Sequence, residues 1–267
     1  MEKIGLLAGA GRLPVECARA AKAMGLEVCA VALLPETDKE LAEHVADYQE
    51  ISVAQLDAIL HYLKEQDVKK VTMIGKVTKE LLFAGNVQPD MHMMQLLMSL
   101  PDRKDDTIMM AFVQELSKAG MQALDQTVLI RQLMPQAGTL TKREPTEEER
   151  KDMEFGFQIA KELGRMDIGQ TVVVKNMAVM ALEAIEGTDA CIQRGGELAN
   201  GGAVVCKVAK PQQDSRFDVP TVGGKTMEKM VSVKASALAI EAGRTLFVER
   251  EKVLALAEAN NITIVAM

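Results

Sequence analysis

The amino-acid sequence predicts a two-domain α/β protein, with a Rossmann-like N-terminal domain built on a parallel sheet and a distinct mixed α+β C-terminal domain. Three observations support this prediction. The 267 residues exceed the usual size of one compact domain. Residues 3–34 alternate between apolar segments and a helical pattern, in the order expected of a βαβ unit. Residues 135–151 are polar and rich in helix and strand breakers, as is typical of a domain linker.

The N-terminal domain is predicted over residues 1–134. It opens with an apolar strand, a Gly-rich turn, an amphipathic helix that ends at Gly25, and a second apolar strand. Residues 53–66 have apolar positions at helical spacing, and residues 69–75 are typical of a third buried strand in a parallel unit. A further helix is expected over residues 105–121, because this apolar pattern starts with Asp and ends with Gly.

The C-terminal domain is predicted over residues 152–267, after the linker at 135–151. A helix is expected to start at the end of the linker, where Pro145, Thr146 and three glutamates form a typical acidic first turn. Most of the predicted strands come before the helices, and this order favours a mixed α+β domain. The expected strands are 170–176, 178–185, 203–209, 245–248 and 262–267, and the expected later helices are 236–243 and 249–261.

The composition excludes several classes of protein. The formal net charge is −7 and no long Lys/Arg block occurs, so we expect no nucleic-acid partner. No apolar run approaches the roughly 20 residues that span a bilayer, and the N-terminus has no signal-peptide pattern, which predicts a cytoplasmic protein. The four cysteines have no metal-ligand or disulfide spacing and are expected to be reduced, buried thiols.

The Gly-rich turn contains Gly9, Gly11 and Arg12 and lies where a strand meets a helix. Backbone N–H groups at such a helix start bind phosphates, which makes the turn a candidate anion site. The alternative is that the glycines only make a tight turn and Pro14 only starts the helix. NAD is disfavoured because Pro14 replaces the third glycine of the dinucleotide fingerprint and no convincing ribose-binding acid follows the second strand.

Charged residues are concentrated in the loop 214–226. If this segment is extended, Asp214, Arg216 and Asp218 share one face, and Pro220 favours an extended or turning conformation over a helix. The two acids would then lie roughly 13 Å apart, too far to share one cation unless the chain curls. The alternative is a solvated, salt-bridged surface loop.

A second acidic cluster follows an apolar strand and contains Glu183, Glu186 and Asp189. Acids at a strand end suit a divalent ion, although Thr188 and Asp189 equally suit helix capping. The three histidines lie far from both clusters in the sequence, and no catalytic Ser-His-acid pattern or Walker loop occurs. Carboxylates, a few cations and Gly-rich turns together favour phosphate chemistry assisted by a metal.

Four blocks carry a family resemblance: 5–14, 167–176, 182–189 and 207–226. They resemble the UDP-2,3-diacylglucosamine pyrophosphatase family of lipid A synthesis, the LpxI type, and the similarity spans nearly the whole chain. One departure is Asn176-Met177, where a glycine turn is expected. The resemblance implies Mg²⁺-dependent hydrolysis to UMP and 2,3-diacylglucosamine 1-phosphate. The alternative from another class is a non-catalytic sensor that binds a nucleotide-sugar or lipid.

The resemblance also implies roles for individual residues. Asp214, Asp218 and Arg216 become the catalytic residues, and Glu183 and Asp189 join the two aspartates as ligands of Mg²⁺. The residues expected to bind substrate are Gly9, Gly11, Arg12, Thr188, Lys210, Thr221, Gly223, Lys225 and Thr226.

The expected partners are a diacylated UDP-sugar substrate and, transiently, the inner face of the cytoplasmic membrane, with a homodimer left as an open alternative. An acylated substrate needs an apolar cleft, and the Met-rich residues 91–100 are one candidate wall for it. Their helical spacing equally fits an ordinary core helix, which we favour.

Overall fold

The computed structural model describes residues 2–77 and 88–267, and the chain forms two compact units. The N-terminal unit comprises residues 1–130 together with Ser215–Phe217. The C-terminal unit comprises Arg131–Asp214 and Asp218–Met267. A short piece of the later sequence is therefore built into the first unit.

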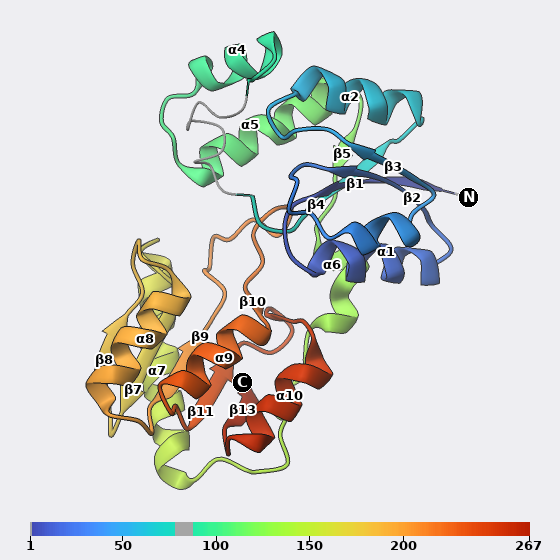
Figure 1. Ribbon diagram of the computed structural model, residues 1–267. Helices are drawn as coiled ribbons and strands as arrows, with labels where there is room; N and C mark the ends of the chain where they lie inside the picture. Colours follow the sequence, from blue (N-terminus) through green and yellow to red (C-terminus); the bar gives the residue numbers. More distant parts are fainter. Residues whose placement is uncertain (1, 78–87) are drawn as a thin grey trace. The chain divides into compact units, whose positions relative to one another are not determined.

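The N-terminal unit is an α/β fold around a five-stranded parallel sheet of order β3-β2-β1-β4-β5. Helices α1 and α6 cover one face, and α2, α4 and α5 cover the other (Figure 1). This arrangement confirms the Rossmann-like prediction. The strands are Lys3–Ala8 (β1), Glu27–Ala32 (β2), Asp47–Glu50 (β3), Lys70–Ile74 (β4) and Gln122–Ala123 (β5), and the helices are Leu13–Ala23 (α1), Leu56–Glu65 (α2), Met91–Ser99 (α4), Asp105–Lys118 (α5) and Thr127–Ile130 (α6), with a 3-10 turn at Lys39–Glu43.

The predicted three-strand unit gains β3 and β5 at its two edges. Strand β3 is polar and half-exposed, and β5 has only two residues, so neither gives the apolar run by which a buried parallel strand is recognised. The inner strands β1 and β2 are buried along almost their full length. They pack side chains such as Leu7 and Val31 against the apolar faces of the helices.

The C-terminal unit is built on a six-stranded mixed sheet of order β6-β13-β11-β9-β7-β8, with helix α7 on one face and α8, α9 and α10 on the other (Figure 1). A two-stranded parallel pair, β10 and β12, lies beside it in the same unit. The strands are Gly138–Thr139 (β6), Thr171–Lys175 (β7), Ala178–Leu182 (β8), Val204–Lys207 (β9), Thr221–Val222 (β10), Ala237–Ile240 (β11), Leu246–Phe247 (β12) and Thr263–Ala266 (β13), and the helices are Glu147–Arg165 (α7), Thr188–Ala199 (α8), Gly224–Ser232 (α9) and Arg250–Ala259 (α10), with a 3-10 turn at Arg131–Leu133.

The helix predicted at 236–243 is wrong, because Ala237–Ile240 is the strand β11. All four residues are buried, and β11 lies between β9 and β13 in the centre of the sheet. A short apolar run of this kind is equally compatible with a buried strand and a buried helix. Helices α8 and α9 also follow strands within the unit, so strands and helices alternate more than the sequence suggested.

Residues 135–151, predicted as a linker, lie in the C-terminal unit. They contain strand β6, which pairs with β13, and the start of α7. The predicted helix start is confirmed: Thr146 and Glu149 form a reciprocal capping box. Both oxygens of Glu149 also accept hydrogen bonds of 2.9 Å from Arg143.

The β7–β8 hairpin turns at Asn176 and Met177, where the sequence analysis expected a glycine turn. Both residues have left-handed backbone conformations, with φ of 53° and 60°. The buried carboxylate of Asp152 accepts hydrogen bonds from the backbone N–H of Asn176 (2.8 Å) and of Met177 (2.6 Å). A carboxylate therefore supports a turn that glycine would make without strain.

All four cysteines are free and buried, in agreement with the sequence prediction. Burial raises the pKa of Cys17 and of Cys191 to about 12, so both are inert thiols. Within residues 2–77 and 88–267, no helix combines the length and the apolar character that crossing a membrane requires.

Candidate functional site

The C-terminal unit contains a buried lysine, Lys207, at the end of the central strand β9. Its side chain is 7% exposed, and its ammonium donates a hydrogen bond of 2.9 Å to the backbone carbonyl of Thr221. The carboxylates of Glu183, Asp189 and Asp218 act electrostatically on this ammonium. Burial lowers the pKa of Lys207, while the three carboxylates raise it, and burial prevails. Three acids from separate parts of the sequence therefore favour the charged form of Lys207.

Glu183 is held rigidly beside this lysine. It is 7% exposed, and its two oxygens accept hydrogen bonds from the Thr188 hydroxyl (2.9 Å) and from the backbone N–H of Gln170 (3.2 Å). The hydroxyl of Thr188 also lies 3.3 Å from that of Thr171, which is the register partner of Lys207 on β7. The predicted substrate-binding residue Thr188 thus contacts the predicted metal ligand Glu183.

Asp189 lies in the first turn of α8, directly after Thr188. The helix starts at Gly187, which has a φ of 81° and makes no side-chain cap. A carboxylate in this position is stabilised by the positive end of the helix dipole. Glu183, which follows β8, and Asp189, in the first turn of α8, both raise the pKa of Lys207 by their charge.

The loop around Asp214 and Asp218 is curled, so of the two predicted conformations, extended or turning, the structure has the turning one. The backbone N–H of Asp218 donates to the carbonyl oxygen of Asp214 at 2.9 Å. The predicted alternation of side chains on one shared face therefore does not occur. Asp218, like Glu183 and Asp189, raises the pKa of Lys207 by its charge.

The three residues between the acids are anchored in the N-terminal unit, which explains the curl. The Ser215 hydroxyl donates to Asp125 at 2.5 Å, and the Ser215 carbonyl accepts from the N–H of Gln126 at 2.9 Å. Phe217 packs against the core of that unit. Arg216 belongs to the same unit, where its guanidinium lies 3.2 Å from the sulfur of Met110.

The remaining predicted binding residues of the C-terminal unit lie around α9 and after β9. Thr221 is in β10, and its carbonyl is the acceptor for Lys207. Gly223 is the N-cap of α9, Lys225 is exposed, and Thr226 is buried. At this helix start, the N–H of Gly224 donates to the carboxylate of Glu249 at 3.2 Å. Lys210, after β9, donates to Asp167 at 2.8 Å.

The Gly-rich turn of the N-terminal unit brings two backbone segments into close approach. The N–H of Gly9 donates to Ile74, and Ala10 and Lys76 exchange two hydrogen bonds of 2.9 Å. A Cβ atom at Gly9 would lie only 2.8 Å from backbone atoms of Gly75 and Lys76. The N–H groups of Gly9 and Ala10 are therefore used within the protein, whereas Gly11, with a φ of 100°, makes the tight turn.

Arg12 is engaged by two acids that the sequence analysis did not select. Its guanidinium donates to Asp38 (3.0 Å) and to both oxygens of Glu40, and Arg19 also binds Glu40. The hydrogen bonds from Arg12 hold the pKa of Glu40 at about 2. Asp38 and Glu40 lie in the polar segment that follows β2 and Thr37. The charged residues of this segment follow neither a helical nor a strand pattern, so the sequence offered no signal for these two acids.

Helix α4 contains the Met-rich segment proposed as either a core helix or a cleft wall. Met93 and Leu96 are buried in the core of the N-terminal unit. The prediction of a core helix is therefore confirmed for the side of α4 that carries these two residues. Met91, Met94 and Met98 are 66%, 43% and 81% exposed. Their spacing places these three methionines on one side of the helix.

The acids around Lys207 have the chemistry of a magnesium site without a complete set of ligands. In the part of the chain that the structure describes, no group of three or more His, Cys, Asp or Glu side chains is arranged to hold a metal ion. Magnesium commonly uses only one or two protein carboxylates and takes its other ligands from water and substrate phosphates. Asp189 and Asp218 fit that donor set, whereas Glu183 is already bonded through both oxygens.

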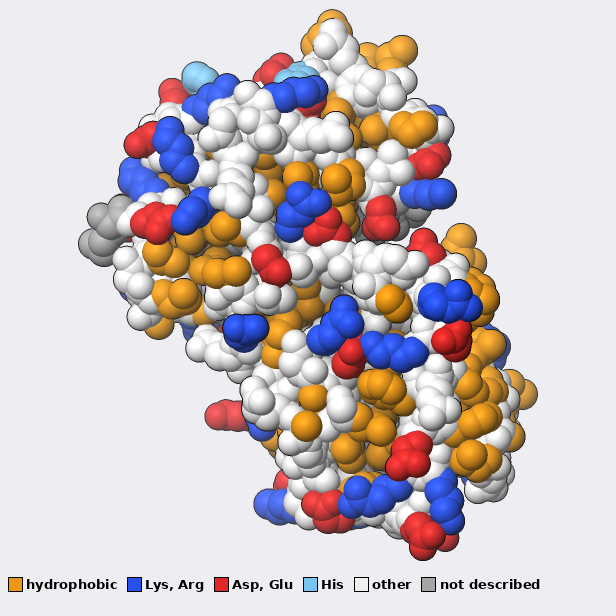
Figure 2. Space-filling view, turned by 180° about the vertical axis from the view of Figure 1, so that it is seen from behind, with side chains coloured by type: hydrophobic (Ala, Val, Ile, Leu, Met, Phe, Trp, Pro, Cys, Tyr) orange, Lys and Arg blue, Asp and Glu red, His pale blue; other side chains and the backbone are white. Residues whose placement is uncertain are grey.

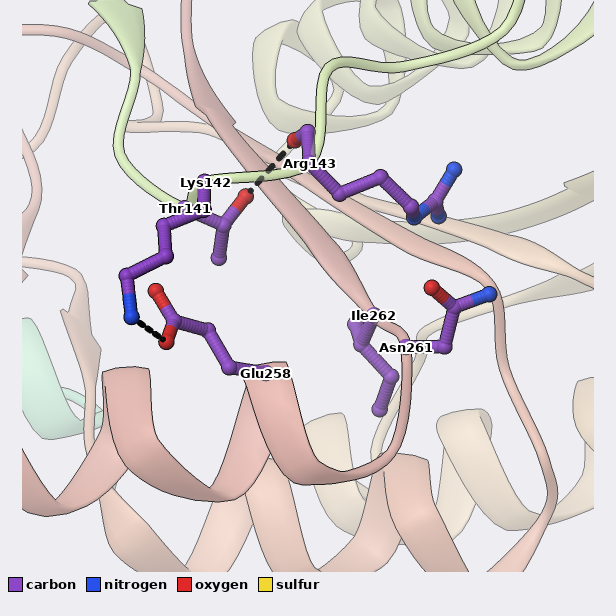
Figure 3. A pocket seen from close by; sticks show the side chains of 6 residues that line it. All are labelled: Thr141, Lys142, Arg143, Glu258, Asn261 and Ile262. Atoms are coloured by element: carbon purple, nitrogen blue, oxygen red, sulfur yellow. Dashed lines mark hydrogen bonds and ion pairs between the residues drawn. The ribbon is translucent and has the colours of Figure 1, made fainter.

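A separate pocket of about 260 Å³ lies between α10 and the segment before α7 (Figure 3). Across it, Lys142 donates to Glu258 at 2.9 Å, so its charged groups are already paired. None of the predicted site residues lines it; the lining residues are Thr141, Lys142, Arg143, Glu258, Asn261 and Ile262. This pocket is therefore not the predicted site.

Figure 2 shows the distribution of charged side chains on one face of the molecule. Acidic and basic side chains are interspersed there, with apolar side chains between them (Figure 2). A protein that binds nucleic acid by neutralising phosphates needs a continuous basic surface.

Comparison with known proteins identifies the family. The LpxI N-terminal domain model matches residues 3–133, and the LpxI C-terminal domain model matches residues 136–265. UDP-2,3-diacylglucosamine pyrophosphatase LpxI of Caulobacter vibrioides is 31% identical over 269 residues, covering 97% of this chain and 95% of the relative.

Solved structures resemble the chain only distantly. UDP-glucose-4-epimerase of Stenotrophomonas maltophila has a TM-score of 0.32 at 13% identity, covering 46% of this chain and 35% of that one. Phosphoribosylglycinamide synthetase of Anaerococcus prevotii has a TM-score of 0.27 at 11% identity, covering 69% and 39%. The chain therefore spans well under half of each of these proteins. On the two domain models and the full-length relative, the protein is an enzyme of the LpxI family.

Proposed function

We propose that the protein hydrolyses the pyrophosphate bond of UDP-2,3-diacylglucosamine to UMP and 2,3-diacylglucosamine 1-phosphate, in lipid A biosynthesis. The observation that carries this proposal is the 31% identity, over 97% of the chain, to a relative named for that pyrophosphatase activity. The acids of the C-terminal unit whose charges raise the pKa of the buried Lys207 support it, because carboxylates are the side chains that metal-assisted phosphate chemistry uses.

We further propose that the reaction depends on Mg²⁺, with Asp189 and Asp218 as the principal ligands and Glu183 and Asp214 close to them. When bound, the ion would offset the negative charge of the pyrophosphate and lower the pKa of a coordinated water. The proposal that the two acids lie near one another is supported by the charge of each, which raises the pKa of Lys207. Hydrogen bonds from Thr188 and Gln170 fix the carboxylate of Glu183, which keeps a negative charge next to the proposed ligands.

The cationic side chains have a complementary task in this proposal. Arg216 would bind a phosphate of the substrate through two N–H groups, and Lys210 and Lys225 would add positive charge near the departing group. Lys210 forms an ion pair with Asp167, whose side chain is 67% exposed. Because solvent weakens such a pair, Lys210 could exchange it for a phosphate of the substrate. An acylated substrate would be collected by transient contact with the membrane surface.

The decisive experiment measures UMP release from UDP-2,3-diacylglucosamine by the purified protein with Mg²⁺ and with a chelator. We expect turnover that the chelator abolishes and that Asp214→Ala and Asp218→Ala each reduce severely. Glu186→Gln is the matched control, because Glu186 is a neighbouring acid that pairs with Arg194 at 2.5 Å on the surface.

Undiminished turnover in both aspartate variants would remove them from the site. A folded wild-type protein that binds the nucleotide-sugar but releases no UMP would instead support a non-catalytic sensor. Full turnover in the presence of chelator would reject the metal while leaving the hydrolase activity intact.

A further inference from the structure

Strand β8 differs from the other edge strands of the protein. Within the described residues, the two large sheets end in the edge strands β3, β5, β6 and β8. Strands β5 and β6 have two residues each, and β3 carries the charges of Asp47 and Glu50. Short length and charge are features by which natural proteins prevent pairing at a sheet edge. Strand β8 has neither, because its five residues, Ala178–Leu182, are all apolar.

The side chains of Val179 and Leu182 lie on a face of the sheet that α7 covers only in part. They pair in register with Val174 and Val172 of β7. Paired residues point to the same face of a sheet, and the two β7 valines pack in one cluster with Leu163 of α7. These valines are fully buried, whereas Val179 and Leu182 are 39% and 40% exposed. Helix α7 therefore covers β7 and leaves the edge strand open.

A bulge in β8 brings the two exposed side chains to the same face. The register skips Met180, whose side chain packs against the core on the opposite face. Met177 and Ile185, which flank the strand, are 50% and 105% exposed. Figure 2 shows hydrophobic side chains gathered along the edge of the C-terminal unit at which Figure 1 places β8. Apolar side chains gathered on a surface in this way mark an interaction site.

We propose that β8 pairs with β8 of a second copy of this chain, antiparallel and about a two-fold axis, so that the two six-stranded sheets become continuous. A two-fold axis places residues near it opposite their own copies, where a charge would face an identical charge. The uncharged sequence of β8 meets this requirement. The carbonyl of Leu182 accepts a hydrogen bond of 2.8 Å from Arg194, which limits the pairing to the residues before it.

The backbone of an edge strand favours a protein strand over a lipid surface as the occupant. A membrane would cover the apolar side chains of β8, but lipid tails offer no hydrogen bonds to the backbone of an open sheet edge. A second β8 strand does both, because it adds backbone hydrogen bonds and brings Val179 and Leu182 against the apolar surface of the other copy.

The test is analytical ultracentrifugation of the full-length wild-type protein over a series of concentrations that reaches well above micromolar. We expect a reversible dimer with twice the 29.0 kDa mass of one chain. Val179→Lys and Leu182→Lys should each raise the dissociation constant of the dimer at least about a hundredfold, because the two-fold axis brings the added charges together. The circular dichroism of both variants should match that of the wild type, since neither side chain is buried.

Two further variants serve as controls. Val179→Thr keeps a β-branched, uncharged side chain and should retain the dimer. Met24→Lys adds the same charge at a methionine of the N-terminal unit that is 56% exposed, and it should form dimers like the wild type. Hydrogen exchange gives a second readout, because the backbone amides of β8 should exchange more slowly in the wild-type dimer than in monomeric Val179→Lys.

Three results would overturn this proposal. The first is a wild type that stays monomeric at every concentration, including one that binds vesicles of phosphatidylethanolamine and phosphatidylglycerol through this surface. The second is a dimer that persists in both lysine variants. The third is a dimer whose β8 amides exchange as fast as those of monomeric Val179→Lys. None of these measurements uses UMP release, so their outcome leaves the hydrolase proposal untouched.

Discussion

The backbone N–H of Asp218 donates a hydrogen bond of 2.9 Å to the carbonyl oxygen of Asp214, and this bond closes one turn of chain between the two acids. An i to i+4 bond implies a rise of about 6 Å between the residues, compared with roughly 13 Å for an extended segment. The curl brings the two predicted acids nearer to each other than the sequence alone suggested. It also turns the three residues between them toward the core of the N-terminal unit, where Phe217 packs.

Because backbone atoms make this turn, Asp218→Asn should remove the negative charge without unfolding the loop. We expect kcat/KM for UMP release to fall roughly a hundredfold, since the site loses an interaction with its metal or phosphate charge. The midpoint of thermal unfolding should stay close to that of the wild type. A variant with normal kcat/KM would show that the charge of Asp218, which acts on Lys207, has no part in the reaction.

The fold was predictable where one physical pattern dominated. The apolar runs that form β1, β2 and β4 and the helical periodicity of α2 gave the parallel unit directly. Strand β11 was misassigned because four buried apolar residues carry no period. Strand β3 was missed because an edge strand with polar side chains lacks a buried face.

The site was predictable only in part, because its organising residue has no motif. Glu183, Asp189 and Asp218 stood out as acids near turns, but Lys207 lies within an apolar strand pattern, VVCKVA. Its surroundings depend on the pairing of β9 with β7, which places Lys207 opposite Thr171, and on the electrostatic influence of three acids that are distant in the sequence. The curl at Asp214 likewise depends on tertiary anchoring of Ser215 by Asp125, which local sequence does not encode.

The backbone contact at Gly9 predicts a large cost for adding a methyl group there. In Gly9→Ala the new Cβ would lie 2.8 Å from backbone atoms of Gly75 and Lys76, which have little freedom to move. We expect the free energy of unfolding, from urea titration of the N-terminal unit's signal, to fall by about 2–3 kcal/mol. Gly120→Ala is the control, because its Cβ meets nothing within 4 Å and only its φ of 82° is unfavourable. Gly120→Ala should lower the free energy of unfolding by about 1 kcal/mol. Equal losses of stability in the two variants would contradict the steric argument.

His92 joins three helices of the N-terminal unit and makes its stability depend on pH. Its two ring nitrogens lie 2.7 Å from Asp57 and 3.0 Å from Glu115, which also binds Lys118. Burial of the ring lowers the pKa of His92, but the bonds to the two acids outweigh it, and the net pKa is above the ordinary value.

A raised folded-state pKa means that His92 stabilises the unit fully below the unfolded pKa, at about 6.5. This contribution is lost as pH rises through the higher folded pKa. The free energy of unfolding should therefore decrease with rising pH above 6.5 more steeply in the wild type than in His92→Gln. His61→Gln is the control, because His61 is exposed and pairs with the exposed Glu65. Parallel pH profiles for the wild type and His92→Gln would refute this linkage.

The β7–β8 hairpin allows a stabilising substitution to be predicted. Met177 has a φ of 60°, which is unfavourable for a residue with a Cβ, and its side chain is half-exposed, so it contributes little packing. Met177→Gly should raise the free energy of unfolding by about 0.5–1 kcal/mol, because glycine adopts this conformation without strain.

Asp152→Ala should act in the opposite direction on the same turn. It would leave the backbone N–H groups of Asn176 and Met177 without their carboxylate acceptor, at a cost of about 2–3 kcal/mol. In the double variant with Met177→Gly, the loss of unfolding free energy should be smaller than the sum of the two single effects. The reason is that a turn that is no longer strained depends less on the carboxylate. Strict additivity in urea denaturation of the four proteins would mean that Asp152 stabilises the unit through contacts other than this turn.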